Sequence, residues 1–78
     1  PGIARHLASR IASHLSSREM EVLALIATGK SNKEIGAVLN VAEATVKVHV
    51  TGILSKLNVA DRTQAIVTAM KRGIIQLD

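Results

Sequence analysis

Residues 32–51 read NKEIGAVLNVAEATVKVHVT, and this stretch decides the fold. Its first part predicts a helix of about two turns that ends at Asn40, because asparagine tolerates the left-handed conformation that closes such a helix. Only a few residues follow before the next helical pattern begins, and so tight a connection sets two helices at a steep angle. Gly36 is small at the point where the two helices would cross most closely. The apolar residues that would hold the pair together are Ile35, Leu39, Val41, Val46 and Val50.

The second of these helices is expected to run from about Glu43 to Leu57. The residues predicted to face the core fall on one stripe, namely Val46, Val50, Ile53, Leu54 and Leu57. The opposite face carries Glu43, Lys47, Val48, Thr51 and Ser55. Two helices in this arrangement form a helix-turn-helix, in which the second helix enters the major groove of duplex DNA by its N-terminal residues. The pattern therefore indicates DNA binding.

Capping residues mark where the other helices begin. Each is followed three positions later by a side chain that can complete the cap, in the pairs Ser16 and Glu19, Ser31 and Glu34, and Asp61 and Gln64. Leu15 and Met20 flank the first pair as a hydrophobic staple. The helices are expected to end near Gly29, Asn40, Asn58 and Gly73.

The chain as a whole is predicted to be all-α, because it shows neither period-two alternation nor a hairpin turn. We expect a four-helix helix-turn-helix domain over residues 16–78, preceded by an amphipathic linker helix over residues 1–15. The other residues predicted to share buried faces are Met20, Leu23, Ala24 and Ala27, widened by Val22, Leu25 and Ile26, then Ile35, Val38 and Leu39, and finally Ala65, Ile66, Ala69 and Met70.

The composition excludes several classes of function. The 78 residues are enough for one domain and contain no Cys, which rules out a disulfide framework and Cys-ligated zinc. Without Phe, Tyr or Trp there is no aromatic platform for unpaired bases, which argues against the common single-strand and RNA-binding modes. The net charge of +4 fits a nucleic-acid partner, although many small soluble domains reach it without one.

No pattern indicates catalysis, a metal or a cofactor. Ser, His and Asp are present, but no spacing or glycine elbow groups them, and there is no phosphate-cradling glycine loop. His6 and His14 lack a third ligand, and His49 lies between core-facing valines and is interpreted as structural. We therefore expect no enzyme activity, no metal and no cofactor.

The termini and the apolar runs bear on location. No apolar run reaches the length of a membrane span and no signal peptide is visible, so we expect a cytoplasmic protein with no membrane partner. The sequence begins at Pro1 rather than Met, so we expect it to be part of a longer chain.

Several separated motifs resemble the LuxR-type regulators, also called the FixJ/NarL type. Residues 15–23 (LSSREMEVL) look like the family's opening L-x-x-R-E-x-E-V-L, and residues 29–35 (GKSNKEI) look like its G-x-S-N-K-E-I. Residues 45–49 (TVKVH) match T-V-K-x-H. The pattern K-L-x-V…R…A is followed by residues 56–59, Arg62 and Ala65.

The resemblance covers residues 15–75 without gaps and implies the DNA-binding output domain of a response regulator. Residues 1–15 also resemble the linker that joins a receiver domain to this module, so control by a receiver or another sensory domain is expected. The family often dimerises through its last helix, which implies contacts of Val67, Met70 and Lys71, although the first two can equally be plain core. Expected partners are double-stranded promoter DNA and a second copy of the chain, with RNA polymerase a further candidate.

The resemblance also implies which residues touch DNA. Base edges or nearby phosphates would be met by Lys47, Val48 and Thr51, and phosphates near helix starts by Ser31, Asn32, Lys33 and Thr45. Lys56 would either touch a phosphate or pair with an acidic residue. The alternatives are an ordinary solvated lysine at 47 and a chance surface valine at 48.

Two positions depart from the family pattern. Ala42 stands where the family usually has Ser, so the second helix of the pair lacks its N-cap side chain. Thr51 stands where many members have Lys or Arg, so one groove contact is uncharged. These departures predict modest affinity or an altered base preference.

Two other functions fit the same residues. In a protein-interaction module, the helices over residues 3–15 and 61–72 would meet partners and the helix-turn-helix would be only a scaffold. A sigma-factor promoter-reading domain uses a similar helix pair, but the match from Lys56 to Arg62 favours the LuxR type.

Overall fold

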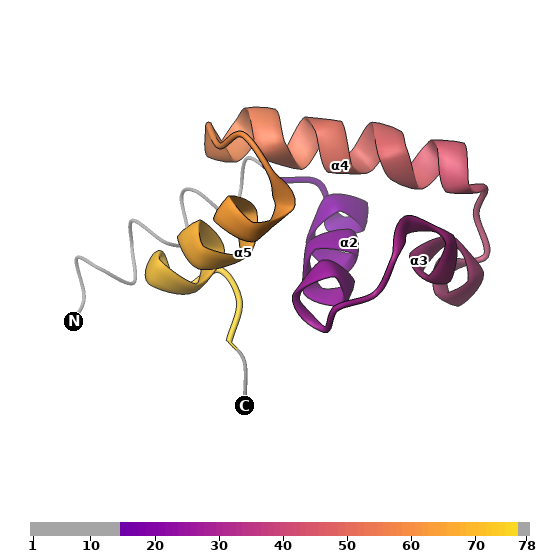
Figure 1. Cartoon of the computed structure of the whole chain (residues 1–78), viewed down its shortest axis with the longest axis horizontal. Coiled ribbons are helices and arrows are strands. Elements are labelled where there is room, and N and C mark those ends of the chain that lie inside the picture. The colour runs from indigo at the N-terminus through magenta and orange to yellow at the C-terminus, as the bar shows by residue number, and fades with distance from the viewer. Residues whose placement is uncertain (1–14, 77–78) are drawn as a thin grey trace.

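The computed structural model describes residues 15–76, which form four helices and no strand. The helices, labelled as in Figure 1, are α2 (Ser17–Ala27), α3 (Asn32–Leu39), α4 (Glu43–Leu57) and α5 (Arg62–Lys71). The predicted all-α class and the four helices of the domain are confirmed. The predicted linker helix over residues 1–15 lies, apart from Leu15, outside the described residues.

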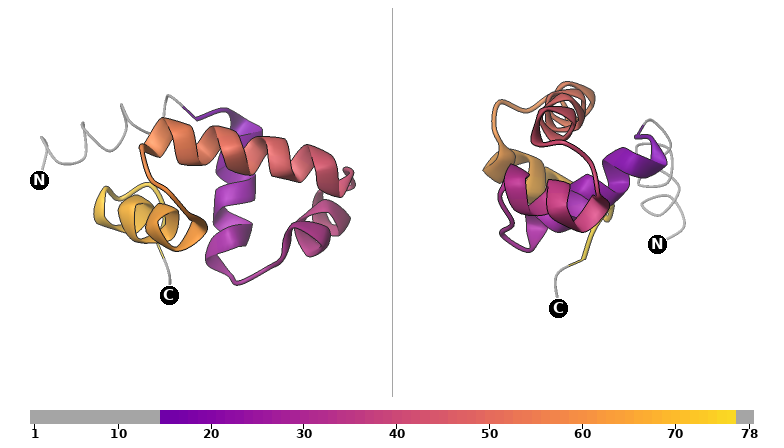
Figure 2. Two further views of the ribbon diagram at one scale, coloured as in Figure 1. Left: turned by 45° about the horizontal axis from the view of Figure 1, so that its top comes forward. Right: turned by 90° about the vertical axis from the view of Figure 1, so that its right-hand side faces the viewer.

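The longest helix, α4, lies along one side of the molecule, and the other three helices lie on its opposite side (Figure 1). The further views in Figure 2 show α2 crossing beneath α4, with α3 towards one end of α4 and α5 towards the other. This arrangement leaves the outer face of α4 uncovered by the rest of residues 15–76.

The helices begin where the capping residues predict. The Oγ of Ser16 accepts from the backbone N–H of Glu19 at 3.0 Å, and Glu19 Oε1 accepts from the N–H of Ser16 at 2.8 Å. Ser31 and Glu34 repeat this reciprocal pair at 3.1 and 2.8 Å. Asp61 Oδ1 accepts from the N–H of Gln64 at 2.9 Å, which caps α5. Both predicted capping boxes and the third cap are therefore confirmed.

The ends of the helices also agree with the sequence. Asn40 and Asn58 take left-handed backbone conformations with φ of 59° and 57°, and they end α3 and α4. Asparagine is one of the few residues that adopts this conformation without a large steric cost. Gly29 follows α2 with φ of 88°, as expected of a glycine just past a helix end.

The turn between α3 and α4 sets the geometry of the helix-turn-helix. The two helices are bent by 108° relative to one another, within the range typical of DNA-binding helix pairs. A Cβ atom at Gly36 would lie 2.7 Å from the backbone oxygen of Val41, so only glycine fits there. The predicted close approach at Gly36 is confirmed.

No single helix within residues 15–76 is long and apolar enough to cross a membrane, and α3 with α4 meets the length and composition only as a bent pair.

Within residues 15–76, the hydrophobic core is built from Leu, Ile, Val and Ala side chains. The largest fully buried side chains are those of Val22, Leu23, Ile35, Val46, Ile53 and Leu57. Leu15 is buried with them, so the core begins just before α2. Four of the five residues predicted for the inner stripe of α4 are buried, and Leu54 packs against the core while partly exposed.

Two predicted core positions are wrong, because Ala24 and Val38 are exposed, Val38 to 57%. Met70, for which core and dimer surface were both left open, is also exposed. Nearly every side of α2 carries apolar residues, so periodicity alone does not select its buried face, which consists of Glu19, Val22, Leu23 and Ile26. In α3 the buried residues are Ile35 and Gly36, and Val38 lies outside this narrow contact.

Candidate nucleic-acid interface

The outer face of α4 presents the three side chains for which the family resemblance implies contact with base edges or nearby phosphates. Lys47, Val48 and Thr51 are all exposed, and Val48 is 70% exposed. Burying a valine side chain stabilises a fold by about 1.5–3 kcal/mol, and the exposed side chain of Val48 does not supply this stabilisation. The face is therefore available to a partner.

Thr51 is oriented by the helix itself. Its Oγ1 donates to the backbone oxygen of Lys47 at 3.0 Å, which commits the only hydroxyl proton. The lone pairs of the oxygen remain to accept hydrogen bonds, and the methyl group remains for apolar contact. Thr51 is thus set up as an acceptor rather than a donor.

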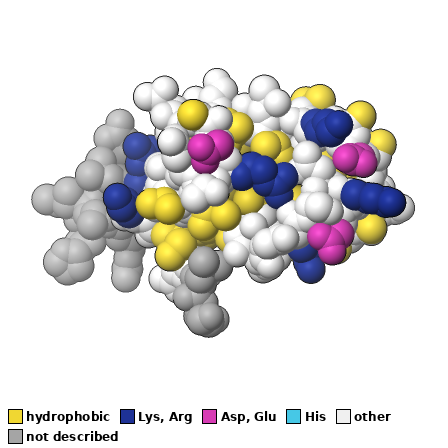
Figure 3. All heavy atoms as spheres, in the orientation of Figure 1, with side chains coloured by type: hydrophobic (Ala, Val, Ile, Leu, Met, Phe, Trp, Pro, Cys, Tyr) yellow, Lys and Arg dark blue, Asp and Glu magenta, His cyan; other side chains and the backbone are white. Residues whose placement is uncertain are grey.

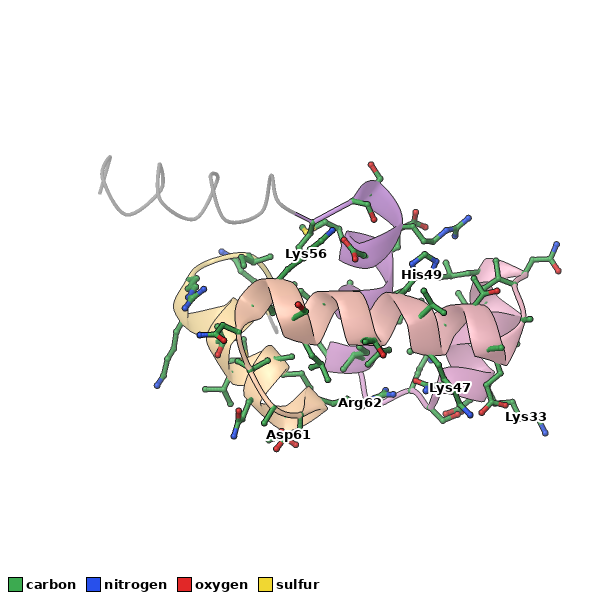
Figure 4. The ribbon with its side chains drawn as sticks, turned by 90° about the horizontal axis from the view of Figure 1, so that it is seen from above. Lys33, Lys47, His49, Lys56, Asp61 and Arg62 are labelled. Atoms are coloured by element: carbon green, nitrogen blue, oxygen red, sulfur yellow. The ribbon has the colours of Figure 1, made fainter. Side chains whose placement is uncertain are left out.

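The basic residues of α4 lie on two different flanks. Figure 4 shows Lys47 on the same side of α4 as Lys33 and Arg62, whereas His49 and Lys56 lie on the other side. Lys56 Nζ donates to Glu19 Oε1 at 2.6 Å. Of the two roles left open for Lys56, pairing with an acidic residue is therefore present in the structure.

Glu19 occupies a tight niche between α2 and α4. A Cβ atom at Gly52 would lie 2.5 Å from Glu19 Oε2, so the missing side chain at Gly52 makes room for the carboxylate. Burial raises the pKa of Glu19, but the hydrogen bonds and charge of Lys56, together with hydrogen bonds from Ser16, lower it below its ordinary value. Glu19 is therefore held as a carboxylate.

The start of α3 combines free donors with one acidic side chain. Lys33 is exposed there, next to Glu34, whose pKa is lowered by hydrogen bonds from Ser31. The first N–H groups of a helix have no acceptor inside the helix, and they favour a nearby anion. Ser31 is exposed beside them, although its Oγ already accepts from Glu34.

Arg62 contributes a contact that the sequence reasoning missed. Its guanidinium donates to the backbone oxygen of Lys30 at 2.7 Å and to Oδ1 of Asn32. The first residue of α5 is thereby fixed to the loop and helix start that lie 30 residues earlier. The signal available in the sequence was an arginine directly after the N-cap, where a helix disfavours positive charge.

The first turn of α4 lacks a side-chain cap, as expected. Ala42 has an extended N-cap conformation, and no side-chain hydrogen bond closes the helix there. Thr45 is exposed in this first turn. The structure thus places Thr45 near the start of α4, at the end of that helix where α3 lies.

His49 is half-buried, so it stands at the edge of the core rather than within it. Among residues 15–76, no three His, Asp or Glu side chains are grouped in a way that could hold a metal ion. His6 and His14 lie outside the described residues.

An apolar area lies on α5, away from α4. Val67 and Met70 are exposed there, next to the exposed Lys71, and Ile74 and Ile75 are partly buried just beyond the helix. Figure 3 shows apolar side chains gathered over this part of the molecule, whereas charged side chains of both signs mix at the end formed by α3 and the start of α4.

A match to known sequences decides the family. The family model GerE, of bacterial regulatory proteins of the luxR family, matches residues 13–69. The chain belongs to the luxR family. This confirms the resemblance noted in the motifs and decides between the LuxR-type and sigma-factor alternatives.

Two curated luxR-type relatives illustrate the match. The chain is 51% identical over 73 residues to the transcriptional regulatory protein LiaR of Bacillus subtilis, and this alignment covers 91% of this chain and 35% of LiaR. It is 53% identical over 62 residues to the response regulator protein VraR of Staphylococcus aureus, and that alignment covers 80% of this chain and 30% of VraR. The chain therefore spans about a third of the length of these curated relatives.

Two solved structures share the fold. The transcription factor GerE aligns with a TM-score of 0.77 and 36% identity, over 82% of this chain and 96% of that chain. The response regulator ChrA of a heme-sensing two-component system aligns with a TM-score of 0.76 and 46% identity, over 78% of this chain and 30% of that chain. The luxR family is one of DNA-binding transcription regulator domains, and it is not an enzyme family.

Proposed function

We propose that this luxR-family domain binds double-stranded promoter DNA sequence-specifically, with α4 in the major groove. The observation that carries the proposal is the uncovered outer face of α4, on which Lys47, Val48 and Thr51 are exposed. The steep turn from α3 supports it, because such a turn lets the second helix project into a groove while the first helix crosses the backbone.

Each side chain on this face suits a different contact. Lys47 can donate to guanine O6 and N7 or to a phosphate, and the methyl groups of Val48 can meet a thymine methyl group. Thr51 presents an acceptor, because its proton is committed to the backbone of Lys47. An acceptor at this position favours the exocyclic amino group of adenine or cytosine.

Phosphate contacts would come from the helix starts. The free N–H groups at the start of α3, with Ser31, Asn32 and Lys33, can hold one strand, and Thr45 can contact the backbone near the start of α4. Lys56 lies on the opposite flank of α4 from Lys47 and would be a further phosphate contact. Its ammonium has three donors, of which Glu19 accepts one, so a phosphate can still be reached.

The functional unit is proposed to be a homodimer that joins through α5. Val67 and Met70 are exposed apolar residues, and Lys71 borders them. A dimer of this kind would span two half-sites about one helical turn of DNA apart. In a longer protein, a receiver or sensory domain that precedes the linker of residues 1–15 would control the pairing in the cytoplasm, and RNA polymerase would be a further partner.

The test compares Lys47→Ala with Arg72→Ala, which removes the same charge from the far end of α5. Binding to duplex DNA is followed by fluorescence anisotropy at several salt concentrations, with unlabelled random DNA as competitor. Lys47→Ala should weaken binding by about 1–3 kcal/mol if it reads a base, or reduce the salt slope by about one if it contacts a phosphate. Arg72→Ala should leave binding close to wild type.

A folded, dimeric protein that fails to bind duplex DNA at low salt would overturn the proposal. It would make the protein-interaction module the better interpretation. Equal losses in Lys47→Ala and Arg72→Ala would also contradict it, since they would indicate attraction by overall charge and not by α4.

A further inference from the structure

The side chain of Arg62 joins three parts of the fold, namely the start of α5, the connection between α2 and α3, and the start of α3. Arg62, labelled in Figure 4, donates to the Lys30 carbonyl in the connection at 2.7 Å and to the amide oxygen of Asn32, the first residue of α3. Both terminal nitrogens of the guanidinium are used, one for each acceptor. All three residues are half-buried, so solvent competes only in part for these bonds.

The chemistry of the pair fixes the orientation of the Asn32 amide. A guanidinium group has donors and no acceptor, so the atom of Asn32 that faces it must be the oxygen. The amide NH₂ group then has to point away from Arg62. Among the side-chain hydrogen bonds within residues 15–76, Asn32 takes part only through its oxygen, which leaves the two N–H donors free.

Those donors lie at the start of α3. Asn32 is the first residue of this helix, and its backbone N–H and that of Lys33 belong to the group that no carbonyl within the helix accepts. The N–H of Glu34 is already taken by Ser31. The amide NH₂ of Asn32 therefore adds to a small set of free donors at one helix end.

The helix dipole disfavours the positive charge of Arg62 at the start of its own helix. A cation in the first turn is opposed by the helix dipole by about 0.3–1 kcal/mol, and the first turn of α5 contains no acidic residue, although the carboxylate of the N-cap Asp61 lies at the same helix end. The favourable contacts of Arg62 are instead made outside α5. Its fork-shaped group suits two acceptors at once, which the single ammonium of a lysine matches poorly.

We propose that Arg62 is a positioning residue for DNA binding, which holds the Asn32 amide so that its NH₂ group donates to a backbone phosphate at the start of α3. Arg62 itself makes no contact with the DNA in this arrangement. The inference rests on the proposed function, because it assigns one phosphate contact within that surface. In this arrangement, the side chain of Arg62 also fixes the position of α5 relative to the phosphate-binding end of α3.

The first experiment uses Asn32→Asp in the 78-residue chain. Aspartate keeps the shape and strengthens the bond to Arg62, so the fold is retained, but the donor is replaced by a repelling oxygen. Affinity for duplex DNA, measured by anisotropy, should fall by about tenfold or more. Gln76→Glu changes the charge equally beyond α5 and serves as the control. Binding by Asn32→Asp equal to that of Gln76→Glu would overturn the inference.

The second experiment separates positioning from direct contact by a double-mutant cycle. Arg62→Lys keeps the charge and should weaken binding about fivefold to tenfold, the value of one neutral hydrogen bond, without changing the salt slope. In an Asn32→Ala background, Arg62→Lys should cost nothing further. Additive losses would show that Arg62 acts independently of Asn32 and would overturn the inference.

The two proposals fail in different ways. If the wild-type chain does not bind duplex DNA, the proposed function fails for every variant alike. If the wild type binds and Lys47→Ala weakens it, but the Asn32 and Arg62 variants bind normally, then only the positioning role fails. Circular dichroism of each variant reports whether the fold is intact.

Discussion

Lys56 and Glu19 are 37 residues apart in the chain and are joined by a hydrogen-bonded ion pair of 2.6 Å. The pair links the last turn of α4 to the first turn of α2, where Glu19 also caps the helix through Ser16. The Glu19 side chain is only 9% exposed, whereas that of Lys56 is 41% exposed. One carboxylate thus serves both a local cap and a long-range contact.

Removing this pair should destabilise the domain. Lys56→Met retains much of the apolar stem but leaves the carboxylate of Glu19 without its charged partner. Because Lys56 is partly exposed, we expect the free energy of unfolding to fall by about 1–2 kcal/mol, between the values for surface and buried pairs. Urea unfolding measures it, and Lys33→Met at an exposed position should stay within about 0.5 kcal/mol of wild type.

Stability should depend on pH through Glu19. Its pKa is lowered in the folded state, so folding is favoured most when the carboxylate is ionised. The contribution is fully present above the ordinary glutamate pKa and is lost as the pH falls through the lowered value. Urea unfolding between about pH 6 and pH 3 should show this loss. The pKa of Glu34 is also lowered, so both carboxylates contribute with the same sign.

Glu19→Gln should flatten that pH dependence more than Gln substitution at the exposed Glu21 does. The amide keeps the shape of Glu19 but cannot titrate. An unchanged pH profile in Glu19→Gln would mean that acid sensitivity arises elsewhere in the chain.

Gly36→Ala should destabilise the helix-turn-helix, although alanine is the better helix former. The new Cβ would lie 2.7 Å from the Val41 oxygen, and a backbone atom cannot rotate away. We expect a loss of about 1–3 kcal/mol in chemical denaturation, the range for overpacking. Val38→Ala, at an exposed site on the same helix, is the control and should change stability little. A neutral Gly36→Ala would show that the turn can open without cost.

Ala42→Ser should stabilise the domain. Ala42 already has the extended conformation of an N-cap, with φ of −67° and ψ of 149°, so a serine hydroxyl can accept from the first turn without rearrangement. The expected gain is about 1 kcal/mol, or a rise in Tm of about 4–8 °C for a domain of this size. Ala44→Ser, inside the helix, should give no such rise, and a matching rise there would contradict the capping explanation.

The features predicted well from sequence are those that depend on neighbouring residues. Capping boxes at Ser16 and Ser31 and the left-handed ends at Asn40 and Asn58 act within a few residues, so residue type and spacing were enough to place them. The exposed face of α4 followed from a single clear stripe.

The features missed depend on contacts across the fold. The hydrogen bond from Lys56 to Glu19 joins residues 37 positions apart, and the one from Arg62 to Asn32 joins residues 30 positions apart. No local pattern in the sequence specifies which acceptor a long side chain reaches. The buried face of α2 was misplaced at Ala24 because apolar residues on several sides of a helix leave its rotation undecided until neighbours pack against it.

The outer face of α4 separates two requirements that many proteins must satisfy with the same residues. Lys47, Val48 and Thr51 are exposed and contribute nothing to the aliphatic core beneath them. Under the proposed function, substitutions at these positions would change which operators are preferred and would leave the scaffold intact. After a gene duplication, one copy of such a scaffold could then acquire new promoters in a few steps, each of which yields a folded protein.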